Sequence, residues 1–239
     1  MTINEKLKIT IFGDSIGKGI TTDGGKPVVM ENSAVTLFEN AYGVSVDNRS
    51  VFGQSLKRIA ERGLIERYLN GLNKDENNVA VLELGGNDAD FNWREVAKTP
   101  SVYHGPQTPI KEFSLLYKET IEKLQDGGVK VVACTIAPID SKRFFDRVIG
   151  SIADSLKVLE FFNGDFNTIH RHQESFNNAI LKNAYSYGLP VIDLREKFLE
   201  SNDFENLMCL DGIHPNQNGQ REIFNAVNEF VCARNLLNA

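Results

Sequence analysis

The chain has 239 residues, 41% of them hydrophobic, and a formal net charge of −6. A chain of this length can bury a substantial core, and we expect one domain over residues 1–239. Its basic residues are scattered singly, without the clustered stripe that a phosphate backbone requires. Nucleic acid is therefore excluded as an expected partner.

The N-terminal residues and the cysteines predict a cytoplasmic protein. Residues 1–6 lack the apolar core of a signal peptide, and no apolar run reaches the roughly 20 residues that span a bilayer. The three cysteines, Cys134, Cys209 and Cys232, show no Cys-x-x-Cys spacing. This pattern favours reduced, buried thiols over a disulfide framework or a zinc site.

The first predicted strand ends in a glycine turn that carries a serine. Residues 7–13 form an apolar run that stops at Gly13-Asp14-Ser15. Ligands of open α/β sheets bind beyond the carboxyl ends of the strands, so Ser15 would face such a site. Gly, Asp and Ser are also common turn formers, and the tripeptide alone does not identify a nucleophile.

The region after this turn is predicted to hold a loop, two helices and a second strand. Residues 21–30 contain glycines and a proline and indicate an irregular loop beside the site. Residues 33–42 predict a short helix, and residues 44–48 predict the second strand. Apolar residues at helical spacing predict one long amphipathic helix over residues 56–69.

The middle of the chain contains the most apolar strand. Residues 79–84 are nearly continuous in apolar character, which is typical of a central parallel strand covered on both faces. This run breaks at Gly85-Gly86-Asn87-Asp88. Residues 89–109 are predicted to form a loop excursion over the site. A helix over residues 113–124 then leads to a fourth strand at residues 129–136.

A helical insertion is predicted between the fourth strand and the next regular helix. In residues 140–172 apolar side chains at helical spacing predict one extra helix, which we interpret as packed on the body, although a mobile lid or a dimer face stays open. A helix over residues 173–187 precedes a fifth strand at residues 190–194, and the chain closes with a helix that passes through Ile223, Phe224, Val227, Phe230 and Val231. The repeated alternation of strands and helices predicts an α/β fold with a parallel sheet.

Three predicted strands end in turns that carry useful chemical groups. The turn at Gly13-Asp14-Ser15, the loop that ends at Gly53, and the turn at Gly86-Asn87-Asp88 follow the first, second and third strands. A single parallel sheet brings such turns together at one edge. A fourth turn, Asp211-Gly212-Ile213-His214, precedes the last helix and is short enough to fold Asp211 onto the imidazole of His214.

These groups match the requirements of acyl transfer. That reaction needs an activated hydroxyl, a base, a carboxylate that orients the base, and donors for the developing oxyanion. Ser15, His214 and Asp211 supply the first three. The backbone amides of Ser15 and Gly53 and the carboxamide of Asn87 are candidate oxyanion donors.

We call the three turns and the loop that ends at Gly53 the four blocks, numbered in chain order. In this order they resemble the four blocks of the GDSL-type, or SGNH, hydrolase superfamily, and they span nearly the whole chain. The resemblance implies that Ser15 is the nucleophile, that Gly53 and Asn87 donate to the oxyanion, and that His214 and Asp211 are the base and its orienting acid. It also implies a flavodoxin-like three-layer α/β/α fold with a five-stranded parallel sheet in the order 2-1-3-4-5.

The same resemblance implies a serine esterase, without a cofactor, that hydrolyses small carboxylic esters through an acyl-enzyme. Esterase, lipase, thioesterase and carbohydrate O-deacetylase activities are all compatible with it. Two positions depart from the family pattern. Ile16 replaces the leucine of the first block, and Ser50 replaces the first glycine of the second block.

Other functions and site residues stay open at this point. Asp14, Asn87, Asp88, Asp211 and His214 could also hold a divalent ion in a metal-dependent phosphoesterase, and the fold could serve as a sugar-binding or lipid-binding module without turnover.

Histidines outside the four blocks offer weaker candidates. His104 is a weak candidate for substrate contact, and a surface histidine is the favoured interpretation. His170 and His172 have no cysteine or carboxylate cluster beside them, so we expect no metal there and interpret them as part of a solvated loop, of which one residue could touch substrate. The sequence leaves the oligomeric state undetermined.

Overall fold

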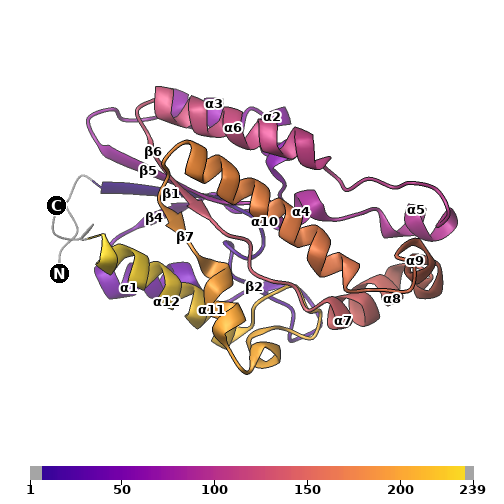
Figure 1. The fold of residues 1–239 in the computed structure, drawn as a ribbon. Coiled ribbons are helices and arrows are strands. Elements are labelled where there is room, and N and C mark those ends of the chain that lie inside the picture. The colour runs from indigo at the N-terminus through magenta and orange to yellow at the C-terminus, as the bar shows by residue number, and fades with distance from the viewer. Residues whose placement is uncertain (1–6, 235–239) are drawn as a thin grey trace.

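The computed structural model, which describes residues 7–234, contains a five-stranded parallel sheet between two layers of helices (Figure 1). The strands lie in the order β4-β1-β5-β6-β7. Their bounds are Leu7–Gly13 (β1), Val46–Asn48 (β4), Asn77–Glu83 (β5), Lys130–Cys134 (β6) and Val191–Ile192 (β7). Numbered in chain order within this sheet, the order is 2-1-3-4-5, and the predicted α/β/α architecture is confirmed.

The helices cover both faces of the sheet because its side chains alternate between two cores. In β5, Ala80 and Leu82 belong to one core, whereas Val79 and Val81 pack against the other. The first core is covered by α2 (Leu56–Glu61), α3 (Leu64–Asn70), α6 (Ile110–Asp126) and α10 (Thr168–Ser186). The second is covered by α1 (Ala34–Tyr42), α11 (Leu194–Glu200) and α12 (Gln217–Ala233).

The register of the sheet determines where the turns meet. β1 pairs with β5 along its whole length, from Leu7 opposite Asn77 to Gly13 opposite Glu83. On its other side, Ile11 of β1 pairs with Asn48 at the end of β4. The turns that follow these three strands therefore leave the sheet at the same edge.

Two predicted segments differ in the structure near this edge. The long helix expected over residues 56–69 is two helices, because Gly63 between them adopts a left-handed conformation with φ of 58°. The segment expected to be an irregular loop contains a small antiparallel ribbon, β2 (Ile20–Thr21) paired with β3 (Val28–Val29). A two-residue strand is too short to leave a periodic signal in the sequence.

The insertion contains more helix than expected. It holds α7 (Ser141–Arg143), a π-helix η1 (Phe144–Ile149), α8 (Gly150–Ile152) and α9 (Ser155–Phe161), and α10 already begins at Thr168. The expected loop excursion carries α5 (Trp93–Lys98), which follows the short α4 (Gly86–Ala89). The excursion and the insertion share a separate hydrophobic cluster, which includes Phe91, Trp93, Phe144 and Phe162. The last irregular stretch holds a 3₁₀-helix, η2 (Phe204–Leu207).

The cysteines are all free, but they are not all buried. Cys134 and Cys209 lie in the interior as expected, whereas Cys232 is exposed near the end of α12, so the expectation of a buried thiol was wrong there. Between residues 7 and 234, no helix combines the length and the apolar character needed to cross a bilayer.

Candidate active site

Ser15 lies on a tight turn at the end of β1. Ile20 and Lys18 donate backbone hydrogen bonds to the carbonyl oxygens of Ser15 and Asp14, at 2.9 and 3.0 Å, and close this turn. Gly13 is required beneath it, because a Cβ there would lie 2.6 Å from the Ser50 hydroxyl and 2.8 Å from a carboxyl oxygen of Glu83. Ser50, which replaces the first glycine of the family's second block, thus packs directly under the turn that carries Ser15.

The structure brings Ser15, His214 and Asp211 together. The Ser15 Oγ atom lies 3.0 Å from Nε2 of His214, although the two residues are 199 positions apart in the sequence. The Nδ1 atom of His214 lies 2.7 Å from Oδ2 of Asp211. With Nδ1 protonated and facing the carboxylate, Nε2 is left as the acceptor for the serine proton.

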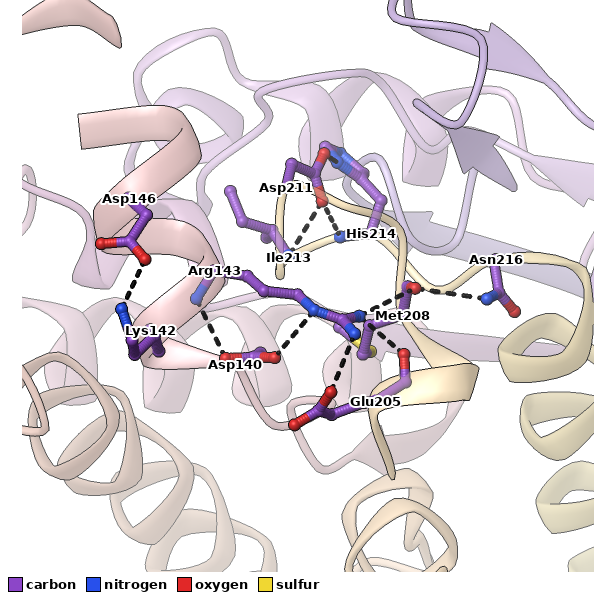
Figure 2. Close-up of polar contacts among 10 residues, drawn as sticks. All are labelled: Asp140, Lys142, Arg143, Asp146, Glu205, Met208, Asp211, Ile213, His214 and Asn216. Carbon is purple, nitrogen blue, oxygen red and sulfur yellow. Dashed lines mark hydrogen bonds and ion pairs between the residues drawn. The ribbon is translucent and has the colours of Figure 1, made fainter. Parts of the chain in front are cut away.

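The loop that carries Asp211 and His214 is folded around the Asp211 carboxylate (Figure 2). Its Oδ1 atom accepts hydrogen bonds from the backbone amides of Ile213 and His214, at 2.9 and 3.0 Å. Burial alone would raise the pKa of Asp211, but the hydrogen bond from His214 and the adjacent imidazole outweigh it and lower that pKa to about 2. The carboxylate is therefore charged at neutral pH.

The helical insertion braces this loop through Arg143. The guanidinium lies 3.3 Å from Oδ2 of Asp140 and 3.1 Å from Oε2 of Glu205, and it donates to the carbonyls of Glu205 at 2.6 Å and Met208 at 3.5 Å (Figure 2). Asp140 also donates its amide to the carbonyl of Gly212, at 2.9 Å. Arg143 thus connects α7 to the chain on the N-terminal side of Asp211.

Gly212 fits this loop because the insertion lies against it. Its φ is 72°, in the left-handed region, and a Cβ there would lie 2.6 Å from the carbonyl oxygen of Asp140. The glycine between Asp211 and His214 therefore allows both the turn and its contact with α7. A side chain at this position would separate the loop from the insertion.

Thr22 contacts Asp211, and sequence reasoning missed this contact. Its hydroxyl donates to Oδ2 of Asp211 at 2.6 Å, the same oxygen that faces His214. Thr22 follows β2 of the small ribbon, outside all four blocks. A lone threonine in a glycine-rich loop carries no sequence signal that could have identified this contact.

The second and third blocks place two further groups beside Ser15. Gly53 has a φ of 69°, and its carbonyl accepts a 2.6 Å hydrogen bond from Arg58. Asn87 donates from Nδ2 to Oδ2 of Asp14 at 3.0 Å, and Asp14 accepts the Ile16 amide on its other oxygen at 2.9 Å. One N–H of the Asn87 carboxamide is thereby fixed, and within residues 7–234 the other N–H has no hydrogen-bond partner, so it can donate to a ligand.

Asp88 has a structural role at the edge of the sheet where Ser15 lies. Its carboxylate accepts the Leu56 amide at 2.8 Å and the Thr108 hydroxyl at 2.7 Å. Burial raises the pKa of Asp88, and these hydrogen bonds oppose that shift. Asp88 therefore ties the start of α2 to the third block.

Two buried carboxyl groups lie beneath the Ser15 turn. Glu83 accepts the amides of Asp14 and Gly17 at 3.2 and 3.0 Å. Burial raises the pKa of Asp14 to about 6, and it raises the pKa of Glu83 well above its ordinary value, with the neighbouring Asp14 adding to the effect. Burial, with the Asp14 carboxylate beside it, therefore favours the protonated form of Glu83.

Ser15, Gly53, Asn87 and His214 line one pocket. The exposed Phe52 ring stacks on the imidazole of His214, with 5.9 Å between ring centroids and an angle of 13° between the planes. The excursion and the insertion supply further walls, which include Asp90, Phe91, Trp93, Phe144, Ile169 and His172, and Ile136, Ile139 and Gln173 also line the pocket. The pocket is therefore largely apolar, with a few polar groups.

The remaining histidines lie at different distances from the pocket. His104 lies outside this pocket, where its Nε2 atom is 3.0 Å from the Thr99 carbonyl and its ring packs against Phe161. His170 and His172 belong to α10 rather than to a loop, and the expected loop was wrong because the helix begins at Thr168. His172 lines the pocket.

Comparisons with known proteins agree with this architecture. The model of the GDSL-like lipase/acylhydrolase family matches residues 11–222. A lipase/acylhydrolase from Enterococcus faecalis has a similar structure, with a TM-score of 0.64 and 20% identity over 95% of this chain and 96% of that chain. Among curated protein sequences, no match is found.

Two further solved structures are similar. Acetyl xylan esterase AlAXEase gives a TM-score of 0.63 and 23% identity over 94% of this chain and 99% of that chain. A member of the lipolytic protein G-D-S-L family from Veillonella parvula DSM 2008 gives a TM-score of 0.64 and 17% identity, over 93% of this chain and 97% of that chain.

The family match covers most of the chain, and the resemblance stated from the four blocks is confirmed. This chain belongs to the GDSL-like lipase/acylhydrolase family, whose members are hydrolases that act on ester bonds.

Proposed function

We propose that this chain is a serine esterase that hydrolyses carboxylic esters through an acyl-enzyme. The observation that carries the proposal is the pair of consecutive contacts from Ser15 Oγ to His214 Nε2, at 3.0 Å, and from His214 Nδ1 to Asp211 Oδ2, at 2.7 Å. A hydroxyl in this arrangement can lose its proton to the imidazole as it attacks a carbonyl carbon.

Acylation begins with attack of the Ser15 oxygen on the ester carbonyl. His214 takes the serine proton, and Asp211 stabilises the imidazolium that forms. The backbone amides of Ser15 and Gly53 and the free N–H of Asn87 donate to the oxyanion of the tetrahedral intermediate. His214 then gives its proton to the leaving alcohol, and the acyl group stays on Ser15.

Deacylation repeats these steps with water. His214 accepts a proton from the attacking water molecule, the same three donors stabilise the second oxyanion, and the proton returns to Ser15 as the carboxylic acid leaves. The buried carboxylate of Asp14 contributes by holding Asn87 in place through its 3.0 Å hydrogen bond. Asp14 is a positioning residue in this scheme.

The contacts of the carboxylates support this chemistry over a metal-dependent phosphoesterase. Asp88 binds the Leu56 amide and the Thr108 hydroxyl, and Asp211 binds His214 and Thr22, so their oxygens are directed at protein donors. Within residues 7–234, no group of three or more His, Cys, Asp or Glu side chains is arranged to hold a metal ion.

Small carboxylic esters, including O-acetylated sugars, are the substrates that we propose to test first. Acetyl xylan esterase AlAXEase is among the similar structures, which supports an acetyl ester as a probe. The pocket beside Ser15 is lined mainly by apolar side chains and closed on one side by the insertion, which supports a short acyl group or a compact alcohol.

Active-site labelling and hydrolysis test the proposal together. The wild-type protein is expected to hydrolyse 4-nitrophenyl acetate and butyrate, to keep this activity in EDTA, and to be labelled by a fluorophosphonate on the peptide that contains Ser15. Ser15→Ala is expected to lose both labelling and turnover, by several orders of magnitude, while it still folds.

Ser186→Ala is a matched control, because Ser186 is exposed at the end of α10 and its hydroxyl donates to the Lys182 carbonyl of the same helix. It is expected to behave like the wild type. Hydrolysis that persists in the Ser15 variant, or that disappears with EDTA, would reject the serine mechanism. Intact folding with no hydrolysis of any ester would favour a binding module.

A further inference from the structure

We propose that Gln173 determines specificity in the pocket beside Ser15, by donating a hydrogen bond from its side-chain amide to an oxygen atom of the substrate. The preferred substrates are then esters that carry an ether or hydroxyl oxygen in the part that occupies the pocket, in preference to esters with a plain alkyl group there. This inference rests on the proposed esterase function.

Gln173 is a buried polar residue in a mainly apolar pocket. It lies on α10, is 8% exposed, and lines the same pocket as Ser15 and His214. Ile136, Ile139 and Ile169 are among the apolar walls. A glutamine is rarely buried without a reason, since its amide and carbonyl both need hydrogen-bond partners there.

Arg195 determines which end of the Gln173 side chain faces the pocket. The Nη1 atom of Arg195 lies 3.3 Å from Oε1 of Gln173. A guanidinium group can only donate hydrogen bonds, so the glutamine must present its oxygen to Arg195. The Nε2 amide group then points away from Arg195, and among residues 7–234 it has no hydrogen-bond partner.

Arg195 is itself held firmly in place. It is 4% exposed, donates from Nη1 to the Ile136 carbonyl at 3.0 Å, and forms an ion pair with Glu174 at 2.7 Å. Its backbone amide also donates to the Thr135 hydroxyl at 2.9 Å. With the oxygen of Gln173 fixed by such a rigid group, the amide cannot turn over to offer an acceptor instead.

The chemical consequence is a pocket with a fixed donor. A ligand oxygen can accept from Nε2, whereas a methylene group at the same place leaves the amide unpaired and shielded from water. A site built to hydrogen-bond a substrate discriminates against the analogue that lacks the partner. One neutral hydrogen bond of this kind corresponds to a preference of about tenfold.

Matched ester pairs measure this preference and locate the oxygen. In the acyl series, 4-nitrophenyl 3-methoxypropanoate is compared with the pentanoate, and longer pairs move the ether oxygen along the chain. In the alcohol series, 2-methoxyethyl acetate is compared with butyl acetate. Each ratio of kcat/KM is divided by the ratio of the hydroxide-catalysed rates, which removes the difference in intrinsic reactivity.

The wild type is expected to prefer the ether by about tenfold in one series, which identifies the part of the ester that occupies the pocket. Gln173→Leu is expected to reduce that ratio to about one. In Gln173→Glu, Arg195 pairs with the new carboxylate and only lone pairs face the pocket, so the ratio is expected to fall below one. Gln217→Leu, at an exposed position on α12, is expected to keep the wild-type ratio.

These outcomes separate the inference from the function on which it rests. A wild type that hydrolyses none of the esters contradicts the proposed function. A wild type that hydrolyses the alkyl esters but shows no ether preference at any position in either series overturns the role of Gln173 alone. A preference that survives unchanged in both Gln173 variants, each checked for folding by its thermal transition, also overturns it.

Discussion

The hydroxyl of Thr22 donates to Oδ2 of Asp211, the oxygen that also faces Nδ1 of His214. Thr22 comes from the ribbon formed by β2 and β3, whereas Asp211 comes from the loop before α12. One carboxylate oxygen thus joins two loops that are 189 positions apart in the sequence. The ribbon is therefore part of the support of the proposed triad.

Replacing Thr22 by Val is expected to lower kcat/KM for a 4-nitrophenyl ester by about tenfold, because a hydrogen bond to a charged group is worth about 1.5–3 kcal/mol, of which solvent recovers a part. Valine keeps the shape of threonine but lacks the hydroxyl. Thr22→Ser retains the hydroxyl and is the matched control, with expected activity close to that of the wild type. Unchanged activity in Thr22→Val would contradict a role for this hydrogen bond, whereas an equal loss in both variants would show that the methyl group of Thr22 is needed as well as its hydroxyl.

Replacing Arg143 by Met is expected to loosen the loop between Glu205 and His214, because the guanidinium contacts Glu205 and the Met208 carbonyl (Figure 2). Amide hydrogen exchange in that loop should accelerate, and kcat should fall more than KM changes, since the loop carries the proposed base. Arg147→Met, at an exposed position of η1, is the control. Unchanged exchange in the Arg143 variant would show that other contacts hold the loop.

Replacing Asn87 by Ala is expected to lower kcat by roughly 10²–10³, with a smaller change in KM, because an oxyanion donor acts chiefly in the transition state. Asn218→Ala, at an exposed position on α12, is the control and should leave both constants unchanged. A loss confined to KM would indicate that Asn87 binds the ground state of the substrate.

The blocks could be located from the sequence because each follows or precedes a regular element. The run of apolar residues in β1 and β5 predicts the strands, and the glycines after them predict the turns that carry Ser15 and Asn87. The parallel topology then brings those turns to one edge. Local patterns therefore predicted the parallel sheet and located the blocks, whereas the strand order followed from the family resemblance that the blocks carry.

The supporting contacts could not be predicted in the same way. Thr22, Arg143 and Gln173 act through partners that are distant in the sequence, and a single residue of each type is compatible with many structures. The insertion was also harder to predict, because its helices are short and include a π-helix, which has a different period from the α-helix. Its packing against the excursion depends on tertiary contacts between aromatic rings.

The buried carboxyl pair beneath Ser15 predicts how stability depends on pH. In the folded protein the pKa of Glu83 lies well above its ordinary value, so the unfolded chain releases this proton at a lower pH than the folded chain does. Between those two pKa values the unfolded state binds fewer protons, and the free energy of unfolding falls as the pH rises. Asp14, whose pKa is raised to about 6, contributes a fall of the same sign between its ordinary value and pH 6.

Glu83→Gln is therefore expected to become more stable relative to the wild type as the pH rises from 5 to 8. Glutamine keeps an oxygen acceptor for the amides of Asp14 and Gly17 but cannot ionise. Thermal unfolding across this range measures the difference in Tm between the two proteins. In a chain of this size, each kcal/mol of difference in the free energy of unfolding shifts Tm by about 2–4 °C. Glu119→Gln, at an exposed position on α6, should show a difference in Tm that does not vary in this way. A Tm difference for Glu83→Gln that is constant from pH 5 to 8 would mean that Glu83 ionises in the folded protein as readily as in the unfolded chain.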